Sequence, residues 1–166
     1  MITDLQITAR KVVSINPATG EALRELECIS EADVHSAVAR ARAAQPAWNA
    51  LSIDRRIAIV RKFQQLLQAQ KSEVAALITQ EAGKPYVEAL LTEVLVVLDA
   101  SRFLIDNTSS FMSEQPVPHG GLAMKTKRGR ILREPHGVVG IVSPWNYPLS
   151  IPAVDALGAL VTGNAV

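Results

Sequence analysis

The stretch from residue 137 to residue 166 constrains the fold more than any other part of the chain. It opens with residues 138–142, a β-branched run that predicts a buried parallel strand. Pro144 and Pro148 cannot continue such a strand, so the chain has to turn between them. A buried strand followed at once by a tight turn indicates an α/β fold built on a parallel sheet.

A nearly all-apolar helix is expected after this turn. Ser150, or the step at Pro148, can begin the helix, because proline is tolerated in a helix's first turn. Gly163 is a natural end for it, and the residues that follow would start a second strand. In open parallel sheets, ligands bind beyond the carboxyl ends of the strands, which is where Trp145 and Asn146 fall.

The first part of the chain predicts an antiparallel β-hairpin. Residues 12–16 and 22–29 flank a turn signal at residues 17–20. Cys28, the single cysteine, lies on the second arm, where Arg24 is the only nearby positive charge that could activate the thiol and two glutamates stand nearby. We therefore interpret Cys28 as a structural residue rather than a nucleophile.

Capping signals predict the first two helices. Ser30 is the N-cap of the first helix, with Asp33 as its reciprocal partner, and Pro46 is expected to end it. Trp48 would then be a packing anchor in a linker. Ser52 caps the second helix. Apolar residues recur at helical spacing in the first helix at Val34, Ala37, Val38 and Ala41.

Two further helices are expected before residue 108. One covers residues 72–82 and stops at Gly83, and the other follows Pro85 and continues to about Asn107. His35, a lone helical histidine without partners, does not predict a metal site. The inward faces of the second and fourth helices are expected to consist of Ile53, Ile57, Val60, Phe63, Leu67, Leu90, Val94, Leu98 and Ile105.

A basic stretch separates the helices from residues 137–166. Residues 108–121 predict a loop, and residues 122–134 alternate weakly and are rich in Lys and Arg, with a possible turn at residues 128–129. Such a stretch could bind phosphate groups. The aromatic residues that would stack on bases are missing, so a solvated or subunit-contacting β-hairpin is favoured.

The composition is that of a soluble globular protein. Apolar residues make up 48% of the 166 residues, and 17 basic residues balance 16 acidic ones for a net charge of +1. This balance favours neither nucleic acid nor an anionic membrane as a partner. The most apolar window, residues 90–105, contains charges and is too short to span a bilayer. With no secretion signal at the N-terminus and one cysteine, we expect a cytoplasmic protein.

Four motifs follow one another along the chain. They are N-P-A-T-G-E at residues 16–21, E-A-G-K-P at residues 81–85, P-W-N-Y-P-L at residues 144–149 and G-N-A-V at residues 163–166. In this order they resemble the NAD(P)-dependent aldehyde dehydrogenase superfamily. The resemblance implies the N-terminal part of that α/β fold. Residues 1–119 would be the hairpin and helices of the cofactor domain, residues 120–136 an oligomerisation-type β-hairpin, and residues 137–166 the start of a Rossmann-like NAD(P)-binding sheet.

The resemblance also implies an activity, the oxidation of an aldehyde to a carboxylic acid with NAD or NADP through a cysteine thiohemiacetal. Thiolate attack puts negative charge on the carbonyl oxygen, and Asn146 matches the family's side-chain amide donor to that oxygen. The alternative for Asn146 is an asparagine that closes a turn through its own backbone.

Other family positions fall on neighbouring residues. Tyr147, which matches a position facing the aldehyde tunnel, could equally pack with its hydroxyl at the surface. The remaining tunnel positions are Ser150 and Val154. The positions that line the dinucleotide are Val142, Ser143, Pro144, Trp145 and Asn146.

The family's nucleophilic cysteine, glutamate base and phosphate turn fall outside these motifs. The chain is therefore expected to be an N-terminal portion that is inactive alone, and the full-length form a homodimer or homotetramer. The helix from Ser150 is also expected to leave Val154, Leu157 and Leu160 uncovered. One alternative is a non-enzymatic truncated homologue that associates with full-length subunits through the basic hairpin. Another is a nucleic-acid binder built on residues 125–133.

Overall fold

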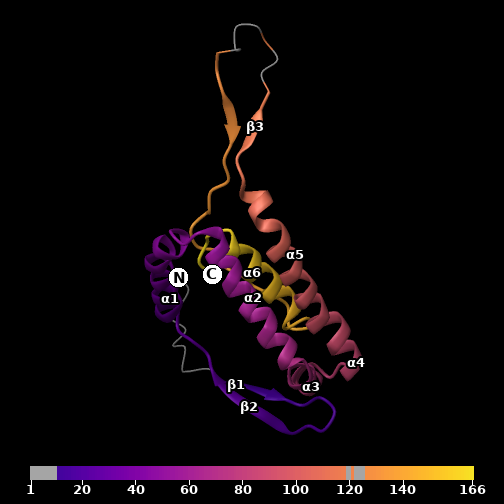
Figure 1. The fold of residues 1–166 in the computed structure, drawn as a ribbon. Helices are drawn as coiled ribbons and strands as arrows, with labels where there is room; N and C mark the ends of the chain where they lie inside the picture. Colours follow the sequence, from indigo (N-terminus) through magenta and orange to yellow (C-terminus); the bar gives the residue numbers. More distant parts are fainter. Residues whose placement is uncertain (1–10, 119–120, 122–125) are drawn as a thin grey trace.

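The computed structural model describes residues 11–118, 121 and 126–166. Its helices form one body, and an antiparallel strand pair lies at each of two opposite ends (Figure 1). Mixed α/β structure with short antiparallel hairpins agrees with the predicted fold class. In chain order the elements are β1 (Lys11–Ile15), β2 (Ala22–Glu27), α1 (Glu31–Asn49), α2 (Ile53–Ala69), α3 (Lys71–Ala82), α4 (Tyr86–Ala89), the π-helical turn η1 (Leu90–Val94), α5 (Leu95–Met112), β3 (Gln115–Val117), β4 (Gly129–Ile131) and α6 (Ser150–Val161).

The first hairpin is confirmed. Strands β1 and β2 pair antiparallel, with a register shift beside Ile15. The turn closes through hydrogen bonds in both directions, from Gly20 N to Asn16 O at 2.8 Å and from Asn16 N to Glu21 O at 2.9 Å. Gly20 has a φ of 74°, a left-handed conformation that glycine adopts without steric cost.

Helix α1 begins as predicted but does not end at Pro46. Ser30 and Asp33 form the reciprocal capping box. Pro46 lies inside the helix, which continues to Asn49, so the placement of Trp48 in a linker was wrong. Proline deprives the carbonyl of Arg42 of its helical partner, and both residues are exposed, so water can satisfy that carbonyl.

Hydrogen bonds to α6 hold the turn after Pro46 in place. Trp48 Nε1 donates to Leu160 O at 2.8 Å, and Gln45 Nε2 donates to Gly163 O at 2.9 Å. No residue of α1 is fully buried, so these polar contacts, rather than the apolar residues expected to face inward, tie the C-terminal turn of α1 to α6. Trp48 is a packing anchor, but from within a helix.

The core lies between α2, α5 and α6, which run side by side (Figure 1). The expected inward faces of α2 and of the helix after Pro85 are confirmed as buried or partly buried. The expectation that α6 would be uncovered was wrong. Leu157 and Val161 are buried against α2 and α5, and Val154 packs against the same cluster. The buried apolar side chains of this core are Ile57, Val60, Leu67, Ala75, Ile78, Ala89, Val94, Val97, Ile105, Leu157 and Val161.

The single helix expected after Pro85 is interrupted by a widened turn. Gly83 ends α3 in the left-handed conformation, with a φ of 70°, and its N–H donates to Thr79 O at 3.0 Å, as predicted. The chain then forms α4, the π-helical turn η1 and α5 without a break. Such single-turn widenings are frequent at functional sites. No helix among the described residues is both long and apolar enough to cross a membrane.

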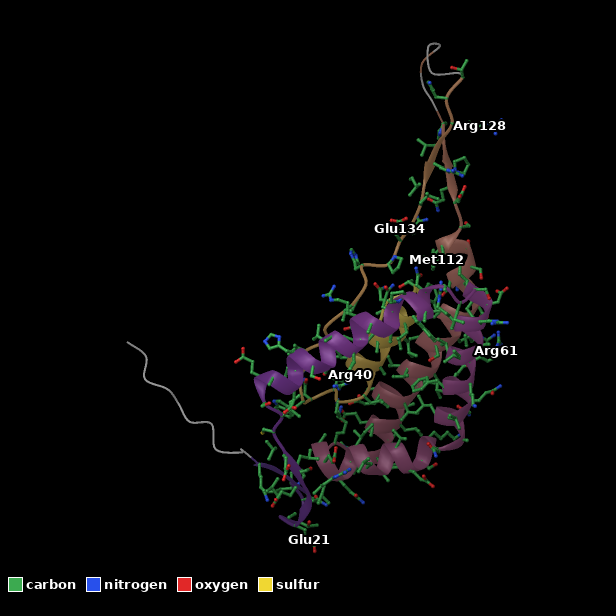
Figure 2. The ribbon with its side chains drawn as sticks, turned by 90° about the vertical axis from the view of Figure 1, so that its left-hand side faces the viewer. Glu21, Arg40, Arg61, Met112, Arg128 and Glu134 are labelled. Atoms are coloured by element: carbon green, nitrogen blue, oxygen red, sulfur yellow. The ribbon has the colours of Figure 1, made fainter. Side chains whose placement is uncertain are left out.

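The second hairpin starts earlier than the sequence predicted. Helix α5 extends to Met112, and β3 begins at Gln115, so the loop expected over residues 108–121 was wrong. Residues 128–129 are not a turn, since Gly129 is already the first residue of β4 and pairs with Val117. Residues 119–120 of the expected loop and residues 122–125 of the basic stretch lie outside the described residues. The hairpin projects well away from the helical body in both views (Figures 1 and 2).

Of the buried parallel strand expected over residues 138–142, the parallel pairing is confirmed at one position, whereas the expected length and burial were wrong. The described residues give it a single parallel bridge, between Val138 and Ala165. The accompanying hydrogen bonds run from Val139 N to Ala165 O at 2.9 Å and from Ala165 N to Gly137 O at 2.8 Å. Pairing among the described residues ends at Val139, and Val142 is fully exposed.

A buried arginine secures the end of α6. Arg56 on α2 donates through Nε to Val161 O at 3.0 Å and through Nη1 to Asn49 O at 3.0 Å and Leu51 O at 2.7 Å. Burial lowers the pKa of this guanidinium. The predicted stop at Gly163 is confirmed, with a φ of 97°. One side chain therefore caps α6 and the loop between α1 and α2.

Candidate active site

The turn that connects residue 142 to α6 carries the predicted site residues at the surface. All five residues predicted to line the dinucleotide are exposed: Val142, Ser143, Pro144, Trp145 and Asn146. The Trp145 residue is 83% exposed. This exposed segment follows the parallel bridge of Val138 with Ala165, on the carboxyl side of the bridged residue.

Lys84 holds the centre of this turn. Its Nζ donates to the backbone oxygen of Asn146 at 2.8 Å and lies 4.0 Å from the centroid of the Tyr147 ring. The same ammonium donates to Glu93 Oε1 at 2.6 Å. Two of the three donor hydrogens of the ammonium are therefore used in hydrogen bonds, and the ammonium also makes a cation–π contact with the Tyr147 ring. The Lys84 side chain is only 10% exposed.

Glu93 holds the end of the turn from inside the core. The Glu93 side chain is 0% exposed, and its Oε2 accepts hydrogen bonds from Leu149 N at 3.1 Å and Ser150 N at 2.8 Å. These are free amides of the first turn of α6, whose N-terminus favours negative charge. Burial alone would raise the pKa of Glu93, but the hydrogen bonds from Lys84, Ser150 and Leu149 outweigh burial and leave the pKa below its ordinary value.

The carboxamide of Asn146 does not close the turn. Across residues 11–118, 121 and 126–166, no hydrogen bond joins this carboxamide to another group, while the Asn146 backbone oxygen is held by Lys84. The alternative in which Asn146 bonds to its own backbone is therefore not seen. The side-chain N–H groups of Asn146 therefore remain free to donate to a ligand, while Lys84 holds the backbone of the same residue in place.

The three residues predicted to line the substrate tunnel occupy different surroundings. Tyr147 is half-buried beneath the Lys84 ammonium. Ser150 is buried as the first residue of α6, and Val154 is half-buried against the core. Of the three, Tyr147 lies beside Asn146 in the chain and shares Lys84 with it.

A shallow hollow adjoins the exposed turn. It has a volume of about 350 Å³ and lies between the first hairpin, the end of α3 and the turn. Its lining residues are Ser14, Pro17, Glu81, Ala82, Trp145 and Pro148. This arrangement brings together parts of three of the motifs found in the sequence, although they are far apart along the chain.

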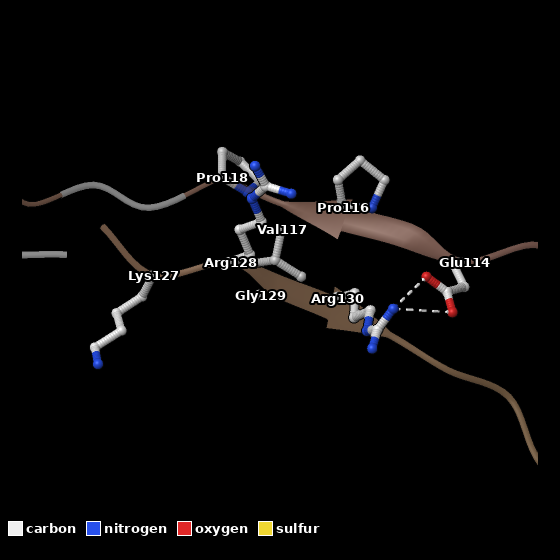
Figure 3. Close-up of a pocket in the computed structure, with 8 residues that line it drawn as sticks. All are labelled: Glu114, Pro116, Val117, Pro118, Lys127, Arg128, Gly129 and Arg130. Atoms are coloured by element: carbon white, nitrogen blue, oxygen red, sulfur yellow. Dashed lines mark hydrogen bonds and ion pairs between the residues drawn. The ribbon is translucent and has the colours of Figure 1, made fainter. Parts of the chain in front are cut away.

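A larger hollow, of about 680 Å³, lies on the second hairpin (Figure 3). Its basic side chains are partly neutralised within the hairpin, since Arg130 Nη1 reaches both oxygens of Glu114 at 2.9 and 3.2 Å. Arg133 Nη2 likewise donates to Gln115 Oε1 at 3.1 Å. These cross-strand contacts support the interpretation of a hairpin rather than a phosphate site, and the hollow contains none of the predicted catalytic residues.

Sequence reasoning missed the roles of Lys84 and Glu93. A signal for each was present. Lys84 belongs to the E-A-G-K-P motif, and Glu93 is a charge inside the most apolar window of the chain. A charged residue at an inward helical position is rarely fully buried unless it is paired, which could have pointed to a partner.

The aldehyde dehydrogenase family model matches residues 5–166, almost the whole chain. The chain belongs to the aldehyde dehydrogenase family. This confirms the resemblance stated from the four motifs.

Named aldehyde dehydrogenases are similar to the chain in sequence and in structure. It is 32% identical over 158 residues to aldehyde dehydrogenase [NAD(P)+] 1 of Saccharomyces cerevisiae, covering 95% of the chain and 30% of that protein. It is 36% identical over 151 residues to N-succinylglutamate 5-semialdehyde dehydrogenase of Chromobacterium violaceum, covering 91% and 30%. The crystal structure of a putative methylmalonate-semialdehyde dehydrogenase from Sinorhizobium meliloti 1021, complexed with NAD, has a TM-score of 0.85 at 30% identity, covering 96% and 31%.

The chain thus spans about 30% of the length of the aldehyde dehydrogenases it matches. The fold of the family is shared over nearly all of the chain, and the region shared includes the turn that carries Asn146.

Proposed function

We propose that this chain is the part of an NAD(P)-dependent aldehyde dehydrogenase that supplies the oxyanion donor. The reaction is the oxidation of an aldehyde to a carboxylic acid. The observation that carries the proposal is the exposed, unengaged carboxamide of Asn146 on a backbone held by Lys84. Family membership supports the reaction class.

Asn146 acts when the aldehyde carbonyl is attacked. The attack turns the carbonyl carbon tetrahedral and moves negative charge onto its oxygen. A side-chain N–H of Asn146 donates a hydrogen bond to that oxygen and stabilises it more strongly in the transition state than in the bound aldehyde. One such donor contributes about 3 to 4 kcal/mol when it is held in place beforehand.

The dinucleotide would be held by residues 142–146. These residues fit that role because they are exposed beyond the bridge at Val138 and keep backbone groups free of sheet pairing. When bound, NAD or NADP accepts the hydride from the aldehyde carbon. The yeast relative is named for NAD(P)+, and the Sinorhizobium structure is complexed with NAD, which supports this cofactor class.

The aldehyde side of the site is assigned to Tyr147, Ser150 and Val154. The Tyr147 ring lies next to the oxyanion donor and can form one wall of an aldehyde channel. Ser150 and Val154 lie further along α6, on the same helix that Glu93 anchors.

The hairpin and Cys28 support the proposed assembly and location. The β3–β4 hairpin projects from the body, which supports a subunit contact in a homodimer or homotetramer (Figure 1). Cys28 is exposed and carries a free thiol, which fits a reducing compartment such as the cytoplasm.

The test of the oxyanion role uses the complete gene product that contains these residues. Asn146→Ala is expected to lower kcat by about 10²- to 10³-fold, measured as NAD(P)H absorbance with excess aldehyde. Asn107→Ala is the matched control, because Asn107 on α5 binds only the carbonyl of Phe103. Unchanged kcat in Asn146→Ala would contradict the proposal.

Residues 1–166 alone are expected to yield no NAD(P)H. Their single cysteine, Cys28, has glutamates at positions 25 and 27 rather than the positive neighbours that activate a thiolate. Turnover by the purified 166-residue chain would contradict this.

A second candidate, a non-enzymatic module that associates with full-length subunits, is favoured by the projecting hairpin. Co-purification of the 166-residue chain with a full-length aldehyde dehydrogenase would support it.

A further inference from the structure

The turn from Asn146 to Ser150 is held at both ends by one buried ion pair. At its start, the backbone oxygen of Asn146 accepts a hydrogen bond from Lys84 Nζ at 2.8 Å. At its end, the amides of Leu149 and Ser150 donate to Glu93 Oε2 at 3.1 and 2.8 Å. Lys84 and Glu93 bind each other at 2.6 Å, so the two ends of the turn are joined through them.

The pair has little freedom to rearrange. Glu93 is fully buried and Lys84 is nearly so, and each polar atom of the pair already has a partner. If Lys84 moved away from Asn146, its ammonium would lose a backbone acceptor. It would also lose its contact with the Tyr147 ring. A lysine held by three partners is a rigid support, unlike a solvated lysine on a flexible stem.

We propose that Lys84 is a positioning residue for the oxyanion donor, with Glu93 as its anchor. This inference rests on the proposed function of Asn146. Lys84 fixes the peptide from which the Asn146 side chain projects, so the carboxamide is already oriented when the carbonyl oxygen gains charge. Because a donor that must first reorient stabilises the transition state less, the pair raises the rate of the chemical step without touching the aldehyde.

The test removes the support without leaving a charge unpaired. In the complete gene product, Lys84→Met combined with Glu93→Gln removes both charges at once and keeps a side-chain oxygen that can accept from Ser150 N–H. The donor to the Asn146 oxygen is lost. We expect kcat to fall at least about tenfold, but less than in Asn146→Ala, and KM for the aldehyde to change less than kcat.

A double-mutant cycle separates positioning from general loosening of the fold. In an Asn146→Ala background, the combined Lys84 and Glu93 change is expected to lower kcat by no more than about twofold further, because the donor it orients is gone. A full additional loss in that background would overturn the inference and leave the role of Asn146 intact. Wild-type kcat in the Lys84→Met/Glu93→Gln variant would also overturn the inference and leave the role of Asn146 intact. Wild-type kcat in Asn146→Ala would overturn the proposed function and this inference with it.

Hydrogen–deuterium exchange gives a readout that does not need turnover. In the Lys84→Met/Glu93→Gln variant, the oxygen kept at position 93 is neutral and accepts more weakly than the carboxylate, so the amides of Leu149 and Ser150 are expected to exchange at least about tenfold faster, while α2 keeps its protection. Equal exchange at these amides in the variant and the wild type would overturn the anchoring, whatever the activity assay shows.

Discussion

Glu93 Oε2 lies 2.8 Å from the backbone nitrogen of Ser150, across 57 residues of chain. The bond connects the π-helical turn η1 to the first amide of α6, and the other oxygen of the same carboxylate connects to Lys84 at 2.6 Å. A single buried side chain thereby links the E-A-G-K-P motif to the turn that carries Asn146. The stability of this link and its chemistry can be measured separately.

Removing Glu93 should destabilise the fold strongly. Glu93→Ala leaves the Lys84 ammonium and the amides of Leu149 and Ser150 without their acceptor in a buried place. The expected loss is about 3 to 5 kcal/mol in the free energy of unfolding, measured by urea denaturation. Glu88→Ala is the control, because Glu88 is exposed on the neighbouring helix α4, and it should change the free energy by less than about 0.5 kcal/mol. Equal losses in the two variants would contradict a buried ion pair.

Acid should lower the stability of the wild-type fold through protonation of Glu93. Its pKa is lower in the folded state than the ordinary value of 4.5, so the carboxylate stabilises the fold fully above pH 4.5. As the pH falls below that value, the unfolded chain takes up the proton first, and stability is lost until the folded-state pKa is passed. The Lys84→Met/Glu93→Gln variant should lack this part of the acid loss. The free energy of unfolding between pH 6 and pH 3 tests this, and parallel curves for the two proteins would refute it.

Arg56 should matter far more than its neighbour in the chain. Arg56→Met leaves the carbonyls of Val161, Asn49 and Leu51 without their donor. We expect a loss of about 3 kcal/mol in the free energy of unfolding, since each unsatisfied buried polar group costs roughly 1 to 3 kcal/mol. Arg55→Met, at an exposed position on the same helix, should be close to neutral. The free energy of unfolding of both variants, measured by thermal and urea denaturation, tests this. Equal losses in Arg56→Met and Arg55→Met would contradict it.

Two glycines at α6 should respond to alanine with opposite signs. In Gly163→Ala the new Cβ would lie 2.4 Å from Asn49 Oδ1 at a φ of 97°, so we expect a loss of about 1 to 3 kcal/mol. In Gly158→Ala the Cβ meets nothing within 4 Å inside a helix, so we expect a gain of about 0.5 to 1 kcal/mol. The difference in melting temperature between the two variants is the measurement, and a shift of the same sign in both would contradict the geometry.

Local signals in the sequence predicted local structure well. Ser30 with Asp33, Gly83 and Gly163 begin or end helices as expected, because the hydrogen bonds that decide these ends lie within a few residues. Pro46 was read by the same local rule and gave a wrong helix end. Its helix continues because Gln45 and Trp48 bind carbonyls at the end of α6, more than 100 residues away.

Residues 138–142 show the other limit of sequence reasoning. Their β-branched pattern predicts a strand, yet a strand forms only where a partner offers backbone groups, and pairing here ends at Val139. The motif around Asn146 pointed to the site, but its support by Lys84 and Glu93 depends on contacts across 62 and 57 residues, which periodicity does not encode.

The π-helical turn fixes how many residues the chain must have between Pro85 and α5. A π-helical turn closes over one residue more than an α-helical turn, so deleting one residue from Leu90–Val94 would convert it to regular α-helix. Ala89 and Val97 would still face the same core, but the direction of Glu93 within the segment would change. A single-codon insertion or deletion here would uncouple the scaffold from the turn that it holds.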